Sequence, residues 1–347
     1  MYFSKLDSLR FYAVSMVFAA HLFQVWTWSD SLSSLLPIGH FGVVIFFVLS
    51  GFLITKLLLE EPLNKPLILS CKEFYIRRSL RIFPIYYLFL AFIYYFNVED
   101  INAAGIMPWL YLTNIHIFNQ NSWIGSHSHL WTLAIEEQFY LIWPFVILFL
   151  RSRIKILLIS LIFIIFTAIL SRIILYLGDF SSLQIKIFSL TVFDFFAFGS
   201  LISIGCIYFK EKLRHLISPL LFFGITLYYG SYYLMSDIAF SIISQFSLSL
   251  ISASFIIFAI YSKNNSKNNF LHNKVTIDLG KISYGIYLYH NIIIAHWLTI
   301  AEFIGLNPSN AIYNKIVFLI MFTIILAKIS YRFIEKPFLQ LKDNFRS

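Results

Sequence analysis

The sequence predicts an all-α, polytopic membrane protein with about ten transmembrane helices and with both termini in the cytoplasm. Apolar residues make up 59% of the chain and charged residues 12%, and the mean hydropathy is +0.78. This composition lies far outside the usual range of soluble domains. Apolar stretches long enough to cross a hydrocarbon core of about 30 Å also recur along the whole chain. We therefore expect a single transmembrane domain over residues 1–347.

The ten apolar stretches give the expected helices in chain order. They lie at about 9–28, 41–59, 82–97, 130–150, 156–177, 188–209, 216–234, 239–261, 282–303 and 312–331. The longest segments between them are 60–81, 97–129 and 262–281. Segment 97–129 contains no Lys or Arg, so we expect it at the outer surface of the membrane.

The basic residues give the orientation. If the N-terminus is inside, 23 of the 26 Lys and Arg residues fall on the inner side. The exceptions are Arg172, Lys186 and Lys315. An excess of positive charge is typical of cytoplasmic loops. An odd number of helices would break this one-sided distribution of Lys and Arg partway along the chain. Membrane insertion therefore explains the net charge of +9, and we expect membrane lipids around the protein. Because the sequence has no compact basic domain, we expect no nucleic-acid partner.

Two ionisable residues, Arg10 and His21, lie in or beside the first apolar stretch. Helical geometry brings them to within about 20° of one face and separates them by roughly 16 Å along the axis. Ionisable groups at membrane depth are rare and usually line a functional path. We expect Arg10 at the cytoplasmic mouth of such a path and His21 near its middle.

Three arginines, Arg77, Arg78 and Arg81, precede the third expected helix. Guanidinium groups bind phosphate through paired hydrogen bonds, and a helix N-terminus adds partial positive charge. The cluster therefore suggests phosphate binding, and ordinary positive-inside anchoring is the alternative.

The fourth expected helix contains Glu136 and Glu137, of which only one can face a site because adjacent side chains point about 100° apart. Glu136 falls within about a turn of the depth of His21. A carboxylate there could orient an imidazole that acts as a general base. The alternative is that both acids lie near the headgroups.

Four other residues attract attention. His127 and His129 could hold a metal, but no third ligand has suitable spacing, so a solvated loop is favoured and no metal is predicted. Asp194 could be a site acid or the partner of a nearby donor. His290 lies deeper in the ninth stretch than an interfacial aromatic belt explains.

Six segments then occur in the order of one family. They are Leu6-Asp7-Ser8-Leu9-Arg10 with His21, Gly42 to Leu53, Arg77 with Arg78 and Arg81, Trp131 with Glu136-Glu137-Gln138-Phe139-Tyr140, Ser283-Tyr284 through His290, and Tyr331 to Pro337. Together they resemble the acyltransferase-3 family of integral membrane acyltransferases, which modify bacterial cell-surface carbohydrates and related acceptors. The resemblance covers nearly the whole chain.

The resemblance implies an O-acetyltransferase of the bacterial cytoplasmic (inner) membrane. It would move an acyl group, most often acetyl, from cytoplasmic acyl-CoA to a hydroxyl of a surface carbohydrate such as lipopolysaccharide O-antigen, or another lipid-linked sugar, on the periplasmic side. Arg77, Arg78 and Arg81 would hold the phosphates of the coenzyme, and its thioester arm would run from Arg10 toward His21. His21 would be a general base or a transient acyl carrier, oriented by Glu136. Expected acceptor-binding residues are Trp131, His129, Tyr284, His290 and Asp194.

The chain also shows no SGNH-type hydrolase segment after its last apolar stretch, so direct transfer is the expected mechanism. The alternative function is a transporter or flippase of a lipid-linked sugar or of the acyl donor. Such a protein would need a polar path but neither thioester cleavage nor a titratable base.

Overall fold

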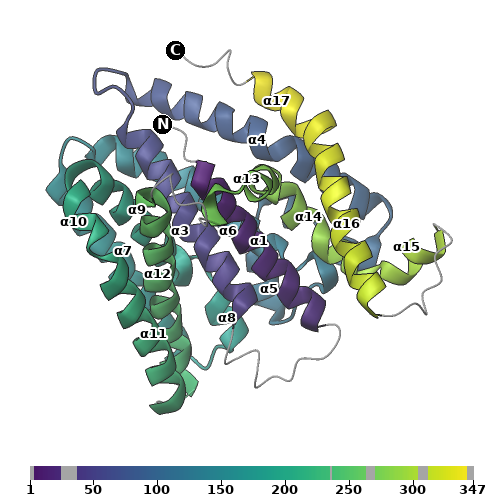
Figure 1. The fold of residues 1–347 in the computed structure, drawn as a ribbon. Coiled ribbons are helices and arrows are strands. Elements are labelled where there is room, and N and C mark those ends of the chain that lie inside the picture. Colours follow the sequence, from purple (N-terminus) through teal and green to yellow (C-terminus); the bar gives the residue numbers. More distant parts are fainter. Residues whose placement is uncertain (1–3, 25–36, 235–236, 263–269, 304–311, 342–347) are drawn as a thin grey trace.

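The structure is a computed structural model that describes residues 4–24, 37–234, 237–262, 270–303 and 312–341. Throughout these residues the ordered elements are helices, and none of them is a strand (Figure 1). This confirms the all-α class.

Each of the ten expected stretches overlaps a helix. These helices are α1 (Ser4–Gln24), α3 (Ile38–Leu59), α4 (Leu67–Tyr95), α6 (Leu130–Leu150), α7 (Ile154–Leu177), α9 (Ser189–Tyr208), α11 (Ile217–Leu234), α12 (Asp237–Tyr261), α14 (Ser283–Ala295) and α16 (Ile312–Ser330). Residues 25–28, where the first stretch was expected to end, lie outside the described residues.

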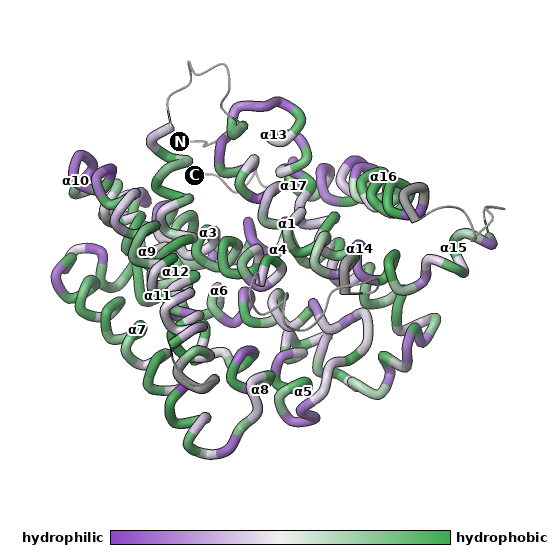
Figure 2. The backbone as a smooth tube through the Cα atoms, turned by 60° about the horizontal axis from the view of Figure 1, so that its bottom comes forward, coloured by the Kyte–Doolittle hydropathy of each residue, from purple (hydrophilic) through white to green (hydrophobic). Residues whose placement is uncertain are grey.

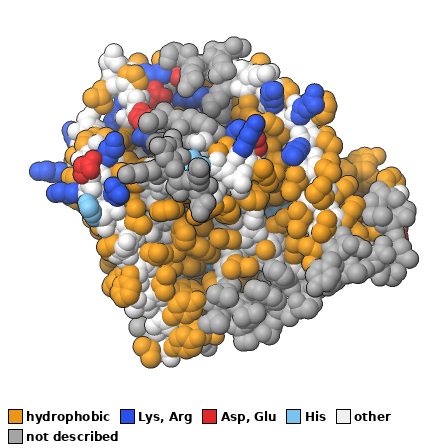
Figure 3. All heavy atoms as spheres, in the orientation of Figure 1, with side chains coloured by type: hydrophobic (Ala, Val, Ile, Leu, Met, Phe, Trp, Pro, Cys, Tyr) orange, Lys and Arg blue, Asp and Glu red, His pale blue; other side chains and the backbone are white. Residues whose placement is uncertain are grey.

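Several helices have the length and apolarity of membrane spans. Within the described residues, six segments are long and apolar enough to cross a membrane: Ile38–Leu59, Gly125–Leu150, Ile154–Leu177, Ser189–Tyr208, Phe240–Tyr261 and Lys315–Leu341. In Figure 2 most of the helical length is hydrophobic, and hydrophilic residues gather at α10 (Lys210–Arg214) and α13 (Lys274–Lys281). In Figure 3 the Lys and Arg side chains of this face lie in its upper part, above a mostly hydrophobic surface.

Short elements occupy the two ends of the bundle. Those at the lower end in Figure 1 include α5 (Thr113–Gln120) and α8 (Ser182–Ile187), and α17 (Lys336–Leu341) lies at the upper end. Between α4 and α6 the chain also forms the 3-10 turns η1 (Val98–Ala104), η2 (Pro108–Leu110) and η3 (Gly125–His127). The remaining short elements are α10, α13, η4 (Phe270–His272), α15 (Trp297–Phe303) and η5 (Tyr331–Glu335), which is one turn of π-helix.

The third expected helix is longer than its apolar stretch. Helix α4 begins at Leu67, so the predicted loop 60–81 is largely helical. Charged residues lower the hydropathy of this part, but Cys71 and Phe74, three residues apart, are both buried on one helix face. The ninth stretch also differs, because it divides at His296 into α14 and α15.

Small residues allow the central helices to approach closely. A methyl group at Gly51 of α3 would overlap the carbonyl of Phe196 in α9, and one at Gly199 of α9 would overlap the carbonyl of Val48. Gly42 meets the Ala13 carbonyl of α1 in the same way. Helix α3 is thus fixed between α1 and α9, which positions the residues described next.

Two cavities in the helix bundle

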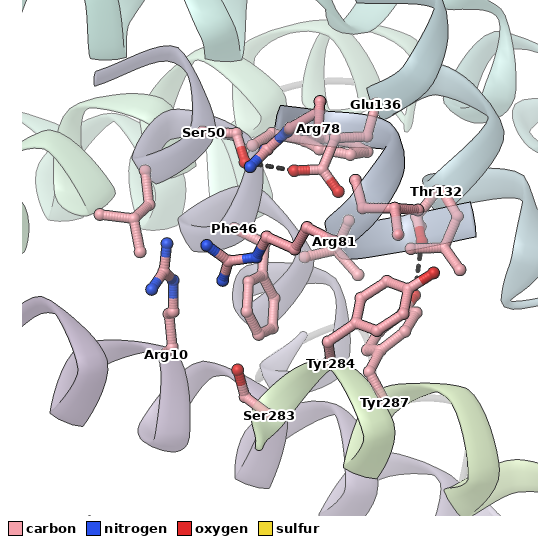
Figure 4. Close-up of a pocket in the computed structure, with 15 residues that line it drawn as sticks. Arg10, Phe46, Ser50, Arg78, Arg81, Thr132, Glu136, Ser283, Tyr284 and Tyr287 are labelled. Carbon is pink, nitrogen blue, oxygen red and sulfur yellow. Dashed lines mark hydrogen bonds between the residues drawn. The ribbon is translucent and has the colours of Figure 1, made fainter. Parts of the chain in front are cut away.

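The first cavity, here called the arginine cavity, has a volume of about 80 Å³. Figure 4 shows Arg10 reaching into it from α1, Arg78 and Arg81 from α4, and Tyr284 from α14. The remaining polar residues of its wall are Ser50, Thr132, Glu136, Ser283 and Tyr287. The structure therefore brings together residues that are far apart in the sequence, among them five of the predicted site residues.

Positive charge dominates the arginine cavity. Arg10 pairs with Asp7 at 2.8 Å, whereas neither Arg78 nor Arg81 forms an ion pair with any residue that the structure describes. The Arg78 guanidinium lies 4.0 Å from the centre of the Tyr140 ring, and its buried Nε has no hydrogen-bond partner in the described part of the chain. An unfilled donor in a wall that carries three guanidinium groups and one carboxylate, Glu136, suits an anion such as a phosphate group.

Arg77 does not share this cavity. Its guanidinium donates to Glu73 at 2.8 Å and to Glu61 at 3.2 Å. Lys65 joins the same acidic pair, and its hydrogen bond to Glu73 raises the pKa of the Lys65 ammonium. The expectation that these arginines lie at a helix N-terminus is wrong, because α4 begins ten residues before Arg77. Arg77 also faces away from Arg78, because adjacent residues of a helix point in different directions.

Glu136 lies in the arginine cavity but does not orient His21. Its carboxylate accepts hydrogen bonds from the hydroxyls of Ser50 and Tyr140. His21 contacts other groups, and it lines a different cavity. The predicted pair was inferred from depth alone, and depth does not fix the direction in which a side chain points. Glu137 does not line either cavity, so only one of the two acids faces a site, as predicted.

The second cavity, here called the histidine cavity, has a volume of about 400 Å³. It shares two wall residues, Val43 and Tyr287, with the arginine cavity. The other polar or aromatic residues of its wall are His21, His40, Trp123, Ser126, Ser128, His129, Trp131, Lys186 and Asn291. Arg10 and His21 thus face two neighbouring cavities from one helix, which agrees with the expected polar path.

A hydrogen-bond chain behind His21 assigns its tautomer. His290 Nδ1 lies 2.6 Å from the Tyr287 carbonyl oxygen, which can only accept, so this nitrogen carries a proton. In a neutral ring His290 Nε2 then accepts from His21 Nδ1, at 3.1 Å. His21 Nδ1 also lies 3.0 Å from the Val17 carbonyl oxygen, which again requires a proton there. His21 Nε2 therefore keeps its lone pair and can act as a base.

His290 itself is fully buried and lines neither cavity. The structure makes it the hydrogen-bond partner of His21, and its role in acceptor binding stays a prediction. The sequence signal was present, since His290 is an ionisable residue at depth, but the sequence does not place α14 beside α1.

The remaining predicted acceptor residues divide between the cavity and the core. His129 and Trp131 line the histidine cavity, and the two ring nitrogens of His129 lie 2.9 Å and 3.1 Å from the carbonyl oxygens of Ser126 and Leu288. These contacts fix the start of α6 against α14. His127 is buried and contacts the Val98 carbonyl at 2.8 Å, so it is not in a solvated loop. In the described residues no group of three His, Cys, Asp or Glu side chains could hold a metal.

Asp194 has the second of its two expected roles, as the partner of a donor. It forms a fully buried ion pair with Arg172 at 2.7 Å, between α9 and α7, and it lines neither cavity. Its carboxylate is occupied by a guanidinium, and acceptor binding by Asp194 stays a prediction.

Sequence reasoning gave no catalytic or binding role to three residues that line the cavities, Ser50, His40 and Lys186, or to Tyr140, which binds Glu136. Ser50 and Tyr140 bind Glu136, and His40 and Lys186 line the histidine cavity. The signal for Lys186 was its position, since it is one of only three basic residues on the expected outer side. Ser50 and Tyr140 lie within the segments that carry the family resemblance, and His40 had no signal beyond its polarity.

Comparisons of the sequence with known proteins give its family. The family profile described as an acyltransferase domain, acyltransferase-3, matches residues 3–331. "Putative peptidoglycan O-acetyltransferase YrhL" of Bacillus subtilis is 27% identical over 97% of this chain and 55% of its own length. "Peptidoglycan O-acetyltransferase OatA" of Listeria monocytogenes is 37% identical over 43% of this chain and 25% of its own length.

These matches cover nearly all of this chain in two of the three relatives, but a much smaller share of each relative. "Putative O-acetyltransferase SACOL0978" of Staphylococcus aureus is 30% identical over 97% of this chain and 57% of its own length. The chain thus spans little more than half the length of the curated relatives it matches. No solved structure matches it. Because the family profile covers nearly the whole chain, the protein belongs to the acyltransferase-3 family of acyltransferase domains.

Proposed function

We propose that this protein is a membrane O-acetyltransferase that moves an acetyl group from acetyl-CoA to a hydroxyl of a cell-envelope carbohydrate. One observation carries the proposal: His290 accepts a hydrogen bond from His21 Nδ1, which keeps the ring proton of His21 on Nδ1 and its lone pair on Nε2. His21 lines a cavity of about 400 Å³. A fixed imidazole with a free nitrogen is what general-base chemistry requires.

The donor would bind on the side of the arginine cavity, which we place toward the cytoplasm. Arg78 and Arg81 would hold a phosphate group, with Arg10 beside them. The thioester arm would then pass between Val43 and Tyr287, the two residues that both cavities share. This path gives the reaction a direction, with the donor entering from one membrane face and the acceptor from the other.

The acetyl transfer would take place in the histidine cavity. His21 Nε2 would accept the proton of the acceptor hydroxyl while its oxygen attacks the thioester carbonyl. The carbon–sulfur bond would then break, and the CoA thiolate would leave and take up the proton from His21. In a second route His21 Nε2 itself attacks the thioester carbonyl, and the carbon–sulfur bond breaks to release the CoA thiolate. The acceptor oxygen then attacks the acyl-imidazole, the bond from the acyl carbon to Nε2 breaks, and the proton of the hydroxyl passes to the thiolate.

The acceptor would lie among the aromatic side chains of the same cavity. Trp123 and Trp131 line it beside His129, and such rings offer apolar faces to a sugar. The family resemblance suggested lipopolysaccharide O-antigen, whereas two of the relatives are named for peptidoglycan. Both are glycans of the bacterial envelope, so we propose that class as the acceptor and the inner membrane as the location.

The test uses purified protein in liposomes supplied with radiolabelled acetyl-CoA and with either O-antigen or peptidoglycan fragments. We expect CoA release and labelled glycan, with a loss of at least about 100-fold in His21→Ala. The control is His215→Ala, because His215 is exposed and lines neither cavity. Passage of intact acetyl-CoA or glycan across the liposome without thioester cleavage would instead support a transporter.

A further inference from the structure

We infer that the histidine cavity contains an anion subsite at Lys186, with His40 beside it as a hydrogen-bond acceptor for a neighbouring ligand hydroxyl or amide. This subsite selects acceptors that carry a carboxylate or phosphate close to the acetylated hydroxyl. This inference rests on the proposed function and adds the chemical class of its acceptor. It starts from the charge balance of the cavity wall.

Lys186 is held in the cavity wall by the fold. It belongs to α8, whose N-terminus is capped by Ser181, because the Ser181 hydroxyl accepts from the Gln184 backbone N–H. Its neighbours Ile185 and Ile187 are both buried. Gln184 donates to the Phe118 carbonyl at 2.9 Å and thereby ties α8 to α5. The short helix is therefore fixed on both sides of Lys186, which is half-buried and lines the histidine cavity.

The Lys186 ammonium has no counter-charge in the described part of the chain. The ion pairs that the structure forms there do not include it, and the nearby acid Asp194 is occupied by Arg172. Burial lowers the pKa of the Lys186 ammonium, as expected for a cation that has lost water without gaining a partner. A ligand that supplies a negative charge would remove this penalty.

His40 supplies the second polar group of the subsite. Its Nε2 lies 2.9 Å from Gln245 Oε1, which accepts, so the ring proton is on Nε2. The other nitrogen, Nδ1, is buried and has no partner among the described residues. It can accept a hydrogen bond from a hydroxyl or amide of the ligand.

The position of these groups relates the subsite to the reaction. His21, His40, Lys186 and the two tryptophans line one cavity, so an anion on Lys186 and a hydroxyl at His21 would belong to the same or adjacent sugar units. An ammonium is a compact point charge and suits a carboxylate as well as a phosphate. The apolar walls strengthen its attraction for either one.

The test compares three probes built on one amino-sugar ring. N-acetylglucosamine is neutral, N-acetylmuramic acid adds a carboxylate, and N-acetylglucosamine 1-phosphate adds a phosphate. We expect one or both anionic probes to be acetylated with a kcat/KM at least about 10-fold above that of the neutral probe. Which of the two is preferred distinguishes a carboxylate acceptor from a phosphate acceptor.

The variants separate Lys186 from general charge effects. Lys186→Gln should abolish the preference, mainly through KM, and Lys186→Arg should keep most of it. The control Lys155→Gln removes the same charge from an exposed site on α7 and should leave the preference unchanged. Equal rates for all probes in the unaltered protein, or a preference that survives Lys186→Gln, would overturn the inference.

A binding measurement keeps this inference distinct from the proposed function. If no probe is acetylated, the shift in thermal unfolding of the detergent-solubilised protein still reports binding. An anionic probe that stabilises the unaltered protein and Lys155→Gln but not Lys186→Gln supports the subsite even though transfer has failed. Absence of stabilisation, or equal stabilisation in all three proteins, contradicts it.

Discussion

His290 Nε2 lies 3.1 Å from His21 Nδ1, so the imidazole proposed as the base is oriented by a second imidazole rather than by a carboxylate. The second ring is itself fixed by the Tyr287 carbonyl at 2.6 Å. A neutral partner orients His21 and sets its tautomer without adding a negative charge beside it. The base is thus favoured in its neutral form, which is the form that accepts a proton.

Replacing His290 should therefore reduce the rate and not the affinity for either substrate. We expect His290→Phe to lower kcat by about 10-fold or more, because His21 loses the acceptor that fixes its tautomer. His290→Gln should keep much of the activity, since an amide oxygen can accept from His21 Nδ1 and the amide nitrogen can donate to Tyr287. Steady-state kinetics of both variants checks this, and equal losses in the two would mean that His290 has only a packing role.

Glu136→Gln tests the partner that the sequence suggested for His21. If Glu136 stabilised protonated His21, its loss would move the acidic limb of the kcat profile to lower pH. Because Glu136 binds Ser50 and Tyr140 instead, we expect that limb to stay in place. The amide cannot accept as strongly from two hydroxyls, so the free energy of unfolding should fall by about 1 kcal/mol. A pH profile of kcat measured together with thermal unfolding decides between the two outcomes.

The sequence predicted elements well and orientations less well. Each of the ten apolar stretches overlaps a helix, because the length and apolarity of a stretch are local properties that hydropathy reports. The common path of Arg10 and His21 also followed from one helix and its period. The partner expected for His21 was wrong, and the partner of Asp194 could not be named, because both depend on which helices pack together and on their rotation. Those contacts are set by close approaches such as Gly51 with Phe196.

Arg78 and Arg77 form a matched pair for donor binding. Arg78 lines the arginine cavity with an unfilled Nε, whereas Arg77 is paired with Glu61 and Glu73. We expect Arg78→Gln to weaken binding of CoA by about 10- to 100-fold, the range for a hydrogen bond to a charged group. Arg77→Gln should change it much less and should mainly lower stability. Inhibition constants for CoA measured on both variants check this, and similar losses in both would argue against the arginine cavity as the donor site.

Gly51 and Gly230 form a matched pair for the packing of α3 on α9. A methyl group at Gly51 would overlap the Phe196 backbone, while one at Gly230 in α11 meets nothing within 4 Å. We expect Gly51→Ala to cost about 1–3 kcal/mol or more in stability through overpacking. Gly230→Ala should be neutral or stabilising by up to about 1 kcal/mol, because alanine favours a helix. Thermal unfolding in detergent measures both, and an unchanged Gly51→Ala protein would show that the two helices separate easily.

The buried pair of Arg172 and Asp194 gives a last test, because it separates a structural role of Asp194 from the acceptor-binding role first expected. Removal of the carboxylate in Asp194→Ala leaves the Arg172 guanidinium buried without its counter-charge, between α7 and α9. We expect this to cost about 3–5 kcal/mol.

The double variant Arg172→Leu with Asp194→Leu removes both charges and should recover most of that loss, since an apolar pair of similar size is tolerated at such sites. Because Asp194 lines neither cavity, KM for the acceptor should stay the same in the double variant. Thermal unfolding together with acceptor kinetics tests this. A double variant that is stable but has a strongly raised acceptor KM would return Asp194 to the binding site.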